Sequence, residues 1–265
     1  MRIARVLSLA ALALLALLLA GCATKRAAPT TYAESAQEAY EVALEDLESQ
    51  NYEQAISGFE QVRTKYPYSS YAALAELRIA DAEFGRGRWL EAIDSYQAFV
   101  KFHPGHEQLD WAWFRIGESH YKAIPSGFFI FPSPSERDQT EVRAARTSLA
   151  DFLSRYPQSA YAPQAREELR EVVGLLAGHE LQVARFYASR ERWTGAAWRY
   201  ERVLRDFPGS GFDAEATFGL ADALREQGET GRAAEILEAF IGQHPSDTDA
   251  RKARAMLDSL GARKP

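Results

Sequence analysis

Apolar and small residues recur along the chain at helical spacing, and each such run ends at a proline. Twelve, eight and five residues before the proline stand an alanine, a large apolar residue and a second apolar residue. Offsets of four and three place these positions on one stripe of a helix. Because proline cannot continue a helix, the pattern predicts five helices that end at prolines. The five sets are Ala55, Phe59, Val62 and Pro67; Ala92, Tyr96, Phe99 and Pro104; Ala145, Leu149, Phe152 and Pro157; Ala196, Tyr200, Val203 and Pro208; and Ala233, Leu237, Phe240 and Pro245.

A second helix is predicted before each of these five, with a small residue where two helices approach closely. The small residues are Ala43, Ala80, Gly117, Ala184 and Ala221. One helix pair cannot bury both of its faces, so successive pairs stack into a curved solenoid. The pattern resembles the tetratricopeptide repeat. The chain is therefore predicted to be all-α, a solenoid of five tetratricopeptide-like helix pairs; a non-repetitive helical domain is the weaker alternative.

The spacing between the prolines is uneven and predicts two irregular features. Repeat 3 holds an apolar insert between its helices, at about 124–138, after which Asp138 and Glu141 resemble a capping box. Repeat 4 has a long first helix, because no proline interrupts residues 164–192. This helix joins an N-terminal block of repeats 1–3, residues 32–160, to a C-terminal block at 161–260, which leaves a tail at 261–265.

The N-terminus is predicted to be a targeting segment. Arg2 and Arg5 precede an apolar run over 6–20, which is shorter than the roughly 20 residues that a membrane span needs. Its end, Leu-Ala-Gly-Cys22, resembles the lipobox of bacterial lipoproteins. The resemblance implies a signal peptide at 1–21, cleavage before Cys22, acylation of Cys22 and a flexible tether at 22–31. An ordinary cleaved signal is the alternative. Alanine after the cysteine implies, by the same resemblance, sorting to the outer membrane.

Charge and chemistry narrow the function further. The chain carries 37 acidic and 31 basic residues, a net charge of −6, which argues against a nucleic-acid partner. Near-matches to a zinc-protease motif at His106 and His179 lack the second histidine. We find no pattern for a catalytic residue, a metal or a cofactor, and predict a protein that is not an enzyme.

By resemblance to tetratricopeptide arrays, the first helix of each pair lines a concave groove. Projection from the small residues gives an apolar groove in repeats 1–3 and a more charged one in repeats 4 and 5. Such a groove suits an extended peptide with aromatic or aliphatic anchors. In the alternative, these side chains pack inside the superhelix against the N-terminal arm or a long neighbouring helix. The predicted groove residues are Tyr40, Leu44, Leu47, Leu77, Phe84, Trp111, Phe114 and Tyr121.

A second candidate surface lies in repeat 4, where residues 181–208 hold six arginines and three acids. Arg199 and Arg202 are one turn apart on the same helix and are able to bind carboxylates through their guanidinium forks. We predict a partner-binding surface that includes Arg185, Arg199 and Arg202. A solvated face with intrahelical pairs such as Glu201–Arg205 is an equal alternative.

The lipobox, the five repeats, the apolar insert, the run Ser135-Glu-Arg-Asp138 and the long helix together resemble the BamD family of outer membrane protein assembly factors. The resemblance implies a lipid-anchored lipoprotein on the periplasmic face of the outer membrane. Its N-terminal repeats would bind unfolded outer membrane proteins. Its C-terminal repeats would bind the periplasmic domain of the BamA-like barrel subunit of the β-barrel assembly machinery, with Arg199 at the family's partner contact. Accessory lipoproteins are further possible partners.

Two other functions compete with this one. A periplasmic repeat scaffold similar to the Tol–Pal coordinator shares the repeats, but it lacks a lipobox and carries an N-terminal coiled coil. The other is a lipoprotein that acts on peptidoglycan, either as an enzyme, which would need a clustered acid or histidine site that the sequence lacks, or as an activator of a hydrolase, an alternative that the sequence leaves open. Co-purification from outer membranes separates the three.

Overall fold

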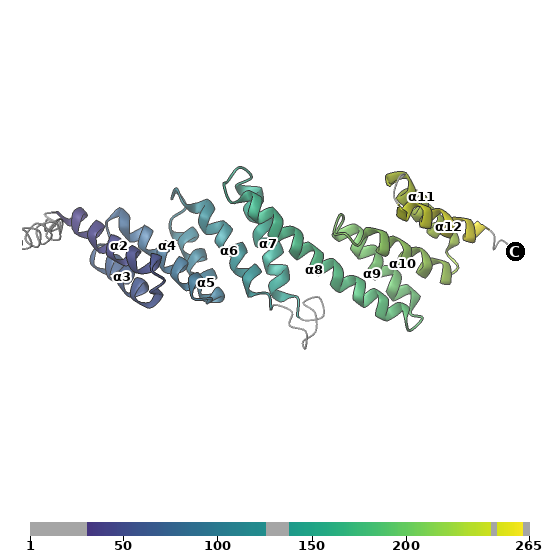
Figure 1. Cartoon of the computed structure of the whole chain (residues 1–265), viewed down its shortest axis with the longest axis horizontal. Helices are drawn as coiled ribbons and strands as arrows, with labels where there is room; N and C mark the ends of the chain where they lie inside the picture. Colours follow the sequence, from purple (N-terminus) through teal and green to yellow (C-terminus); the bar gives the residue numbers. More distant parts are fainter. Residues whose placement is uncertain (1–30, 126–137, 245–247, 262–265) are drawn as a thin grey trace, which may run out of the picture.

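The structure, a computed structural model, describes residues 31–125, 138–244 and 248–261, and every regular element in these ranges is an α-helix (Figure 1). The predicted signal peptide, Cys22, nearly all of the tether, the insert from 126 to 137 and the last four residues lie outside the described residues. None of the described helices is both long and apolar enough to span a membrane. The helices are α2 (Tyr32–Glu48), α3 (Tyr52–Lys65), α4 (Ser70–Gly85), α5 (Trp89–Phe102), α6 (Leu109–Ala123), α7 (Thr140–Arg155), α8 (Ala162–Ala188), α9 (Trp193–Asp206), α10 (Asp213–Glu226), α11 (Thr230–Gln243) and α12 (Thr248–Gly261).

The helices pack in chain order as five pairs followed by α12, which confirms the predicted solenoid. Figure 1 shows the pairs stacked side by side along the long axis of the molecule. All fifteen alanine, large and apolar positions of the repeat pattern are buried, none with more than 7% of its surface exposed. The pattern therefore marks the interior of each helix pair.

The second helix of each pair ends two residues before its proline, and its C-cap residue directly precedes the proline, so the helices stop where the prolines predict. The C-cap residues are Tyr66, His103, Tyr156, Phe207 and His244, and each donates its backbone N–H to the carbonyl four residues earlier. A proline at the next position has no N–H to continue the ladder, so the helix stops there.

The turns between the paired helices in repeats 1, 2, 4 and 5 share one backbone form. The left-handed position is held by Gly87 and Gly228 in two repeats, and by Gln50 and Glu191 in the others. The residue after each left-handed position donates its N–H to the carbonyl five positions earlier, as from Asn51 to Asp46 at 2.8 Å. Glycine takes this conformation without strain, whereas glutamine and glutamate do not.

The long helix of repeat 4 is present as α8, with 27 residues and a length of about 40 Å. It starts two residues before the predicted 164 and ends four before 192, because a turn through Arg190 and Glu191 intervenes. It packs against α7 and then against α9, and in Figure 1 it runs diagonally between the two blocks of repeats.

The capping box predicted at Asp138 and Glu141 is wrong. The N-cap of α7 is Gln139, and Asp138 accepts hydrogen bonds from Thr140 instead, at 3.1 Å from its N–H and 2.8 Å from its hydroxyl. Glu141 contacts His120 at 2.8 Å. A capping box does occur at the start of α2, between Thr31 and Glu34.

Candidate functional site

The first helices of repeats 2 and 3 carry the same four-residue motif. Arg78-Ile-Ala-Asp81 lies in α4 and Arg115-Ile-Gly-Glu118 lies in α6, 37 residues later. In each motif the arginine and the acid are one turn apart and form an ion pair, which is 2.8 Å long between Arg115 and Glu118. The small residue between them is buried against the next helix. The motif thus puts one paired arginine on the same side of each repeat.

Tyr96 joins the two motifs. This tyrosine of α5 is fully buried, and its hydroxyl donates to Asp81 at 2.6 Å while accepting from the Nε of Arg115 at 3.1 Å. Burial, followed by the charge of Asp81, raises the pKa of Tyr96 well above its ordinary value. The phenol therefore stays protonated, and the two repeats are held in register by a protonated bridge.

Two aromatic rings enclose Arg115. Its guanidinium carbon lies 3.3 Å from the centre of the Phe84 ring and 4.7 Å from that of Trp111. The Nε1 of Trp111 donates to Asp81 at 2.9 Å, so this ring is held by the motif of the preceding repeat. We call Arg78, Asp81, Trp111, Arg115 and Glu118 the inner network.

The inner network extends to both neighbouring repeats. Arg78 donates to the hydroxyl of Tyr40 in α2 at 3.3 Å and to Gln108 at 2.5 Å. At the other end, Gln164 of α8 bonds Glu118 at 3.3 Å and Glu168 at 2.9 Å. Polar contacts thus run without interruption from the first helix pair to the long helix.

Glu168 is the least satisfied acid of this region. Its side chain is buried, and its Oε2 has no hydrogen-bond partner among the described residues. Burial, with the nearby charge of Glu118, raises its pKa to about 7, although the bond from Gln164 acts in the opposite direction. A neighbouring phenol, Tyr121, has its pKa raised to about 12, mainly by its hydrogen bond to Glu171.

The predicted apolar groove needs correction, because several of its residues belong to the core. Leu77 and Phe114 are fully buried, with 0% and 2% exposed, and so do not line an open surface. Tyr40 packs its ring on Phe59 and Tyr71 and exposes only 8%. These three positions therefore belong to the core and do not form an open apolar groove.

The other predicted groove residues are half-buried and fall into two groups. Leu44 and Leu47 pack on the core of repeat 1. Phe84 and Trp111 enclose Arg115, while Tyr121 bonds Glu171 of α8. Trp111 and Phe114 also contact Tyr161, just before α8, with ring centres 4.8 and 5.3 Å apart. The alternative of packing against a long neighbouring segment therefore holds for part of the set.

Sequence reasoning missed Arg78 and Arg115, which are the centre of the site. The available signal was the repeated motif itself, since both arginines stand two positions before the small residue. The predicted groove positions were instead Leu77 and Phe114, the residues directly before these two arginines.

The arginine surface of repeat 4 is built around a buried acid. Glu180 of α8 is 4% exposed, and its two oxygens accept from Arg199 at 2.7 Å and from Arg202 at 2.9 Å. Both arginines thus reach one carboxylate of their own chain, a shared acceptor that the sequence analysis did not predict. Their guanidinium carbons also lie 4.8 and 5.3 Å from the ring centre of Trp198, which is 50% exposed.

The remaining charges of this surface are arranged differently from the expected intrahelical pair. Arg205 bonds Asp206 at 2.8 Å, and Glu201 pairs with Arg232 of the next repeat at 2.8 Å. Arg185 is exposed and bonds Glu215 at 2.7 Å. Trp198 is therefore the exposed aromatic ring of this surface, and it lies beside the two guanidinium groups that bind Glu180.

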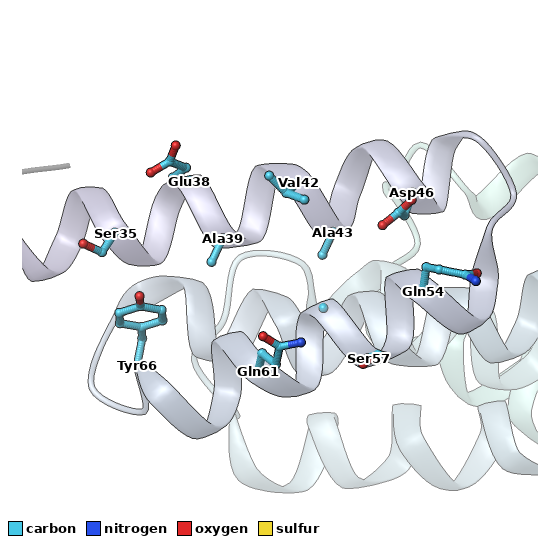
Figure 2. A pocket seen from close by; sticks show the side chains of 11 residues that line it. Ser35, Glu38, Ala39, Val42, Ala43, Asp46, Gln54, Ser57, Gln61 and Tyr66 are labelled. Atoms are coloured by element: carbon cyan, nitrogen blue, oxygen red, sulfur yellow. The ribbon is translucent and has the colours of Figure 1, made fainter. Parts of the chain in front are cut away.

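A hollow of about 580 Å³ lies at the N-terminal end of the solenoid, between α2 and α3 (Figure 2). Figure 2 shows Ala39 and Ala43 of α2 directed toward α3, with Glu38 and Val42 directed outward. At Gly58 an added Cβ would lie 2.7 Å from the Cβ of Ala43, so only glycine allows this close approach. Within the described chain, no preceding helix covers this face.

Comparison with known proteins assigns the chain. A family model described as outer membrane lipoprotein, YfiO, matches residues 32–234. The chain belongs to this outer membrane lipoprotein family. A tetratricopeptide-repeat model also matches residues 214–257, which agrees with the fold of repeat 5 and α12.

Two curated relatives of this YfiO-family chain carry the name outer membrane protein assembly factor BamD. The protein of Neisseria meningitidis is 28% identical, over 89% of this chain and 92% of its own. That of Caulobacter vibrioides is 28% identical, over 79% of this chain and 67% of its own. Among solved structures, the yeast Sti1 TPR2AB domain aligns over 86% of this chain and 83% of its own, with 13% identity and a TM-score of 0.43, too low to carry an argument.

These findings support a role in outer membrane protein assembly on a tetratricopeptide-repeat fold. Within the described residues, no group of three or more histidine, cysteine, aspartate or glutamate side chains is placed to hold a metal ion.

Proposed function

We propose that this chain is a non-enzymatic, lipid-anchored component of the machinery that inserts β-barrel proteins into the outer membrane. In this proposal Cys22 carries the acyl chains and holds the repeats on the periplasmic face. Each buried methylene contributes about 0.8 kcal/mol, so several chains give a durable anchor where one does not. The lipobox supports the anchor, and the BamD relatives support the assembly role.

The anchor is tested by Cys22→Ser in the full-length chain. The variant is expected in the soluble fraction after cell lysis, with the mass of an unacylated chain. Recovery of Cys22→Ser in the outer membrane in the same amount as the parent would remove Cys22 from the proposal.

The single observation that carries the substrate site is the enclosed guanidinium of Arg115. Phe84 and Trp111 offer ring faces beside a cation, on the same side of the solenoid as Arg78. An unfolded barrel substrate that ends in an aromatic residue would place its ring on these faces and its carboxylate near the arginines. Binding of this kind would also cover a strand edge that is prone to aggregate.

This site is tested by the affinity of the full chain for a peptide that ends in phenylalanine. Phe84→Ala with Arg115→Lys is expected to raise the Kd at least tenfold. Phe102→Ala, which removes a 67% exposed ring at the end of α5, is the matched control and is expected to leave the Kd unchanged. Equal Kd values for all three proteins would remove the inner network from the proposal. Tyr40→Ala is a poorer probe because Tyr40 is a core residue.

The proposed contact with the barrel subunit uses Trp198, Arg199 and Arg202. An exposed tryptophan beside two arginines has the composition of an interface hot spot. Arg185 extends the same positive surface along α8. Trp198→Ala is expected to reduce recovery of the barrel subunit in a pull-down, because it removes exposed surface without unpairing Glu180. Leu90→Ala, at a 60% exposed leucine in repeat 2, is the control. Unchanged recovery with Trp198→Ala would exclude this contact.

A further inference from the structure

Repeats 2 and 4 contain closely similar turns between their two helices. The sequences are Arg86-Gly87-Arg88-Trp89 and Arg190-Glu191-Arg192-Trp193. The turns have the same register, since the N–H of Arg88 bonds the carbonyl of Glu83 and that of Arg192 bonds Tyr187, both at 3.0 Å. The second residue of the repeat 4 turn, Glu191, takes the left-handed conformation that Gly87 has in repeat 2. One turn can therefore serve as an internal reference for the other.

In repeat 2 the two arginines have acidic partners in this chain. Arg86 lies 3.0 Å from Glu53 and 3.9 Å from Glu83. Arg88 also lies 3.9 Å from Glu83, so that one carboxylate serves both arginines. The ion pairs within repeats 1 and 2 thus give both arginines a structural role.

In repeat 4 the acid that serves both arginines of repeat 2 has no counterpart. The position of Glu83 is taken by Tyr187. Across the described ranges, no carboxylate lies within the 4.0 Å of an ion pair to Arg190 or Arg192. The helix that precedes the turn in repeat 4, α8, has 27 residues, whereas its counterpart in repeat 2, α4, has 16. The extra length of α8 carries its turn away from the preceding helix pair.

At this turn, where repeat 2 has ion pairs, repeat 4 has a pocket of about 650 Å³. It is lined by Phe186, Tyr187, Arg190, Arg192, Trp193 and Gln227, among others. Phe186 is 52% exposed, and the guanidinium carbon of Arg190 lies 3.9 Å from its ring centre. An added Cβ on Gly195 would lie 3.2 Å from the Tyr187 ring, so glycine allows that ring to pack here. Thr194 closes one side by a 3.1 Å bond to Gln227.

We propose that this turn pocket docks a partner protein segment that presents a carboxylate beside an aliphatic or aromatic side chain. The two unpaired arginines bind the carboxylate, and Phe186, Tyr187 and Trp193 surround the apolar side chain. A ligand that offers only negative charge, with no apolar side chain, would bind the arginines but would leave the exposed ring of Phe186 without a role. Arginines near the C-terminal end of a helix also stabilise it through the helix dipole. This effect is the same in both turns, because both have arginines at the same positions, so it does not explain why only repeat 2 has acidic partners for them. The pocket shares no residue with the Trp198 surface and does not depend on the assembly role.

The first test compares thermal stability in full-length chains. Arg86→Gln with Arg88→Gln removes two satisfied cations and is expected to lower Tm by about 2 °C or more. Arg190→Gln with Arg192→Gln removes cations that have no acidic partner among the described residues and is expected to change Tm by less than about 1 °C. An equal loss of Tm in both double variants would show that the repeat 4 arginines are structural and would overturn the proposal.

The second test measures binding of a fluorescein-labelled peptide, Gly-Ser-Asp-Phe-Leu-Asp-Ser-Gly, by anisotropy. Arg190→Gln with Arg192→Gln is expected to raise its Kd at least tenfold, while Arg86→Gln with Arg88→Gln, which has the same change in charge, leaves it unchanged. Peptides with both aspartates replaced by asparagine, or with Phe-Leu replaced by Ala-Ala, are expected to bind at least tenfold more weakly. Equal loss in both double variants, equal binding of the asparagine peptide, or no binding by the parent chain would each overturn the proposal. None of these outcomes affects the lipid anchor or the Phe-ending peptide result.

Discussion

The guanidinium carbon of Arg115 lies 3.3 Å from the centre of the Phe84 ring, a contact that joins α6 to α4 across the inner face of the solenoid. Arg115 also bonds Tyr96 and Glu118, so that one side chain links three helices and both copies of the repeated motif. The inner network therefore both holds repeats 2 and 3 together and supplies the groups proposed to bind substrate.

Arg115→Ala is expected to lower the free energy of unfolding by about 1–3 kcal/mol, because it leaves the buried carboxylate of Glu118 without its cation. Urea denaturation of the full chain measures this change. Arg170→Ala, at an exposed pair with Glu167 2.6 Å away, is the control and is expected to cost at most about 0.5 kcal/mol. Equal effects of the two substitutions would show that the network adds no stability.

Glu168 is expected to make stability depend on pH near neutrality. Its pKa is about 7 in the folded chain, against 4.5 for an ordinary glutamate, because the side chain is buried. Between these pH values the folded chain holds a proton that the unfolded chain has released. Stability from this group therefore falls as the pH rises from about 4.5 to about 7.

The substitution Glu168→Gln removes this titration and is expected to flatten the fall of Tm between pH 5 and pH 8. At pH 8 the variant is expected to be more stable than the parent by about 1 kcal/mol, after allowance for solvent screening. Glu167→Gln, on the exposed side of α8, is the matched control and should keep the parent profile. A parallel pH profile for Glu168→Gln and the parent would contradict the burial of this charge.

The sequence predicted the helices well because burial and helix termination are local. Ala92, Tyr96 and Phe99 all lie on one buried stripe, and the helix stops at Phe102, with His103 as its C-cap, because Pro104 follows. The capping box at Asp138 failed because three neighbouring polar residues can each serve as a cap. Gln139 took the position, while Asp138 bonded the Thr140 amide.

The turns predict a simple stabilising substitution. Gln50 has a φ of 61°, where Gly87 and Gly228 stand in the matching turns. Gln50→Gly is expected to add about 0.5 kcal/mol, since relief of left-handed strain exceeds the entropy cost of glycine. The reverse change, Gly87→Ala, is expected to lower stability by about 1 kcal/mol in the same urea titration. Destabilisation by Gln50→Gly would show that the side chain of Gln50 makes a contribution that its backbone conformation does not indicate.

Substitutions of the two arginines that bind Glu180 are expected to have strongly non-additive effects on the free energy of unfolding. Removing Arg199 or Arg202 alone leaves the other guanidinium on the carboxylate, at an expected cost of about 1 kcal/mol each. Removing both leaves a buried charge unpaired and is expected to cost about 3–5 kcal/mol. A double-mutant cycle of alanine variants, measured by urea denaturation, gives the coupling. Strict additivity would mean that Glu180 finds another partner or water.

The candidate site was harder to predict than the fold. The sequence showed which residues lie on the first helix of each pair, but a shift of one position exchanges a core leucine, Leu77, for a surface arginine, Arg78. Only the three-dimensional packing decides which of these adjacent residues is buried, since α4 has apolar or small residues on several sides. The sequence placed Arg199 and Arg202 one turn apart but did not indicate their shared acceptor, because Glu180 lies 19 residues away from Arg199 in another helix.

The most direct test of the proposed division between the two blocks is co-purification of the full-length lipoprotein from detergent-solubilised outer membranes. The measured quantities are the barrel subunit and the unfolded β-barrel chains recovered with it. The account predicts that Phe84→Ala with Arg115→Lys reduces recovery of unfolded chains only, and that Trp198→Ala reduces recovery of the barrel subunit only. Loss of both partners with either variant, or of neither partner with both variants, would contradict it.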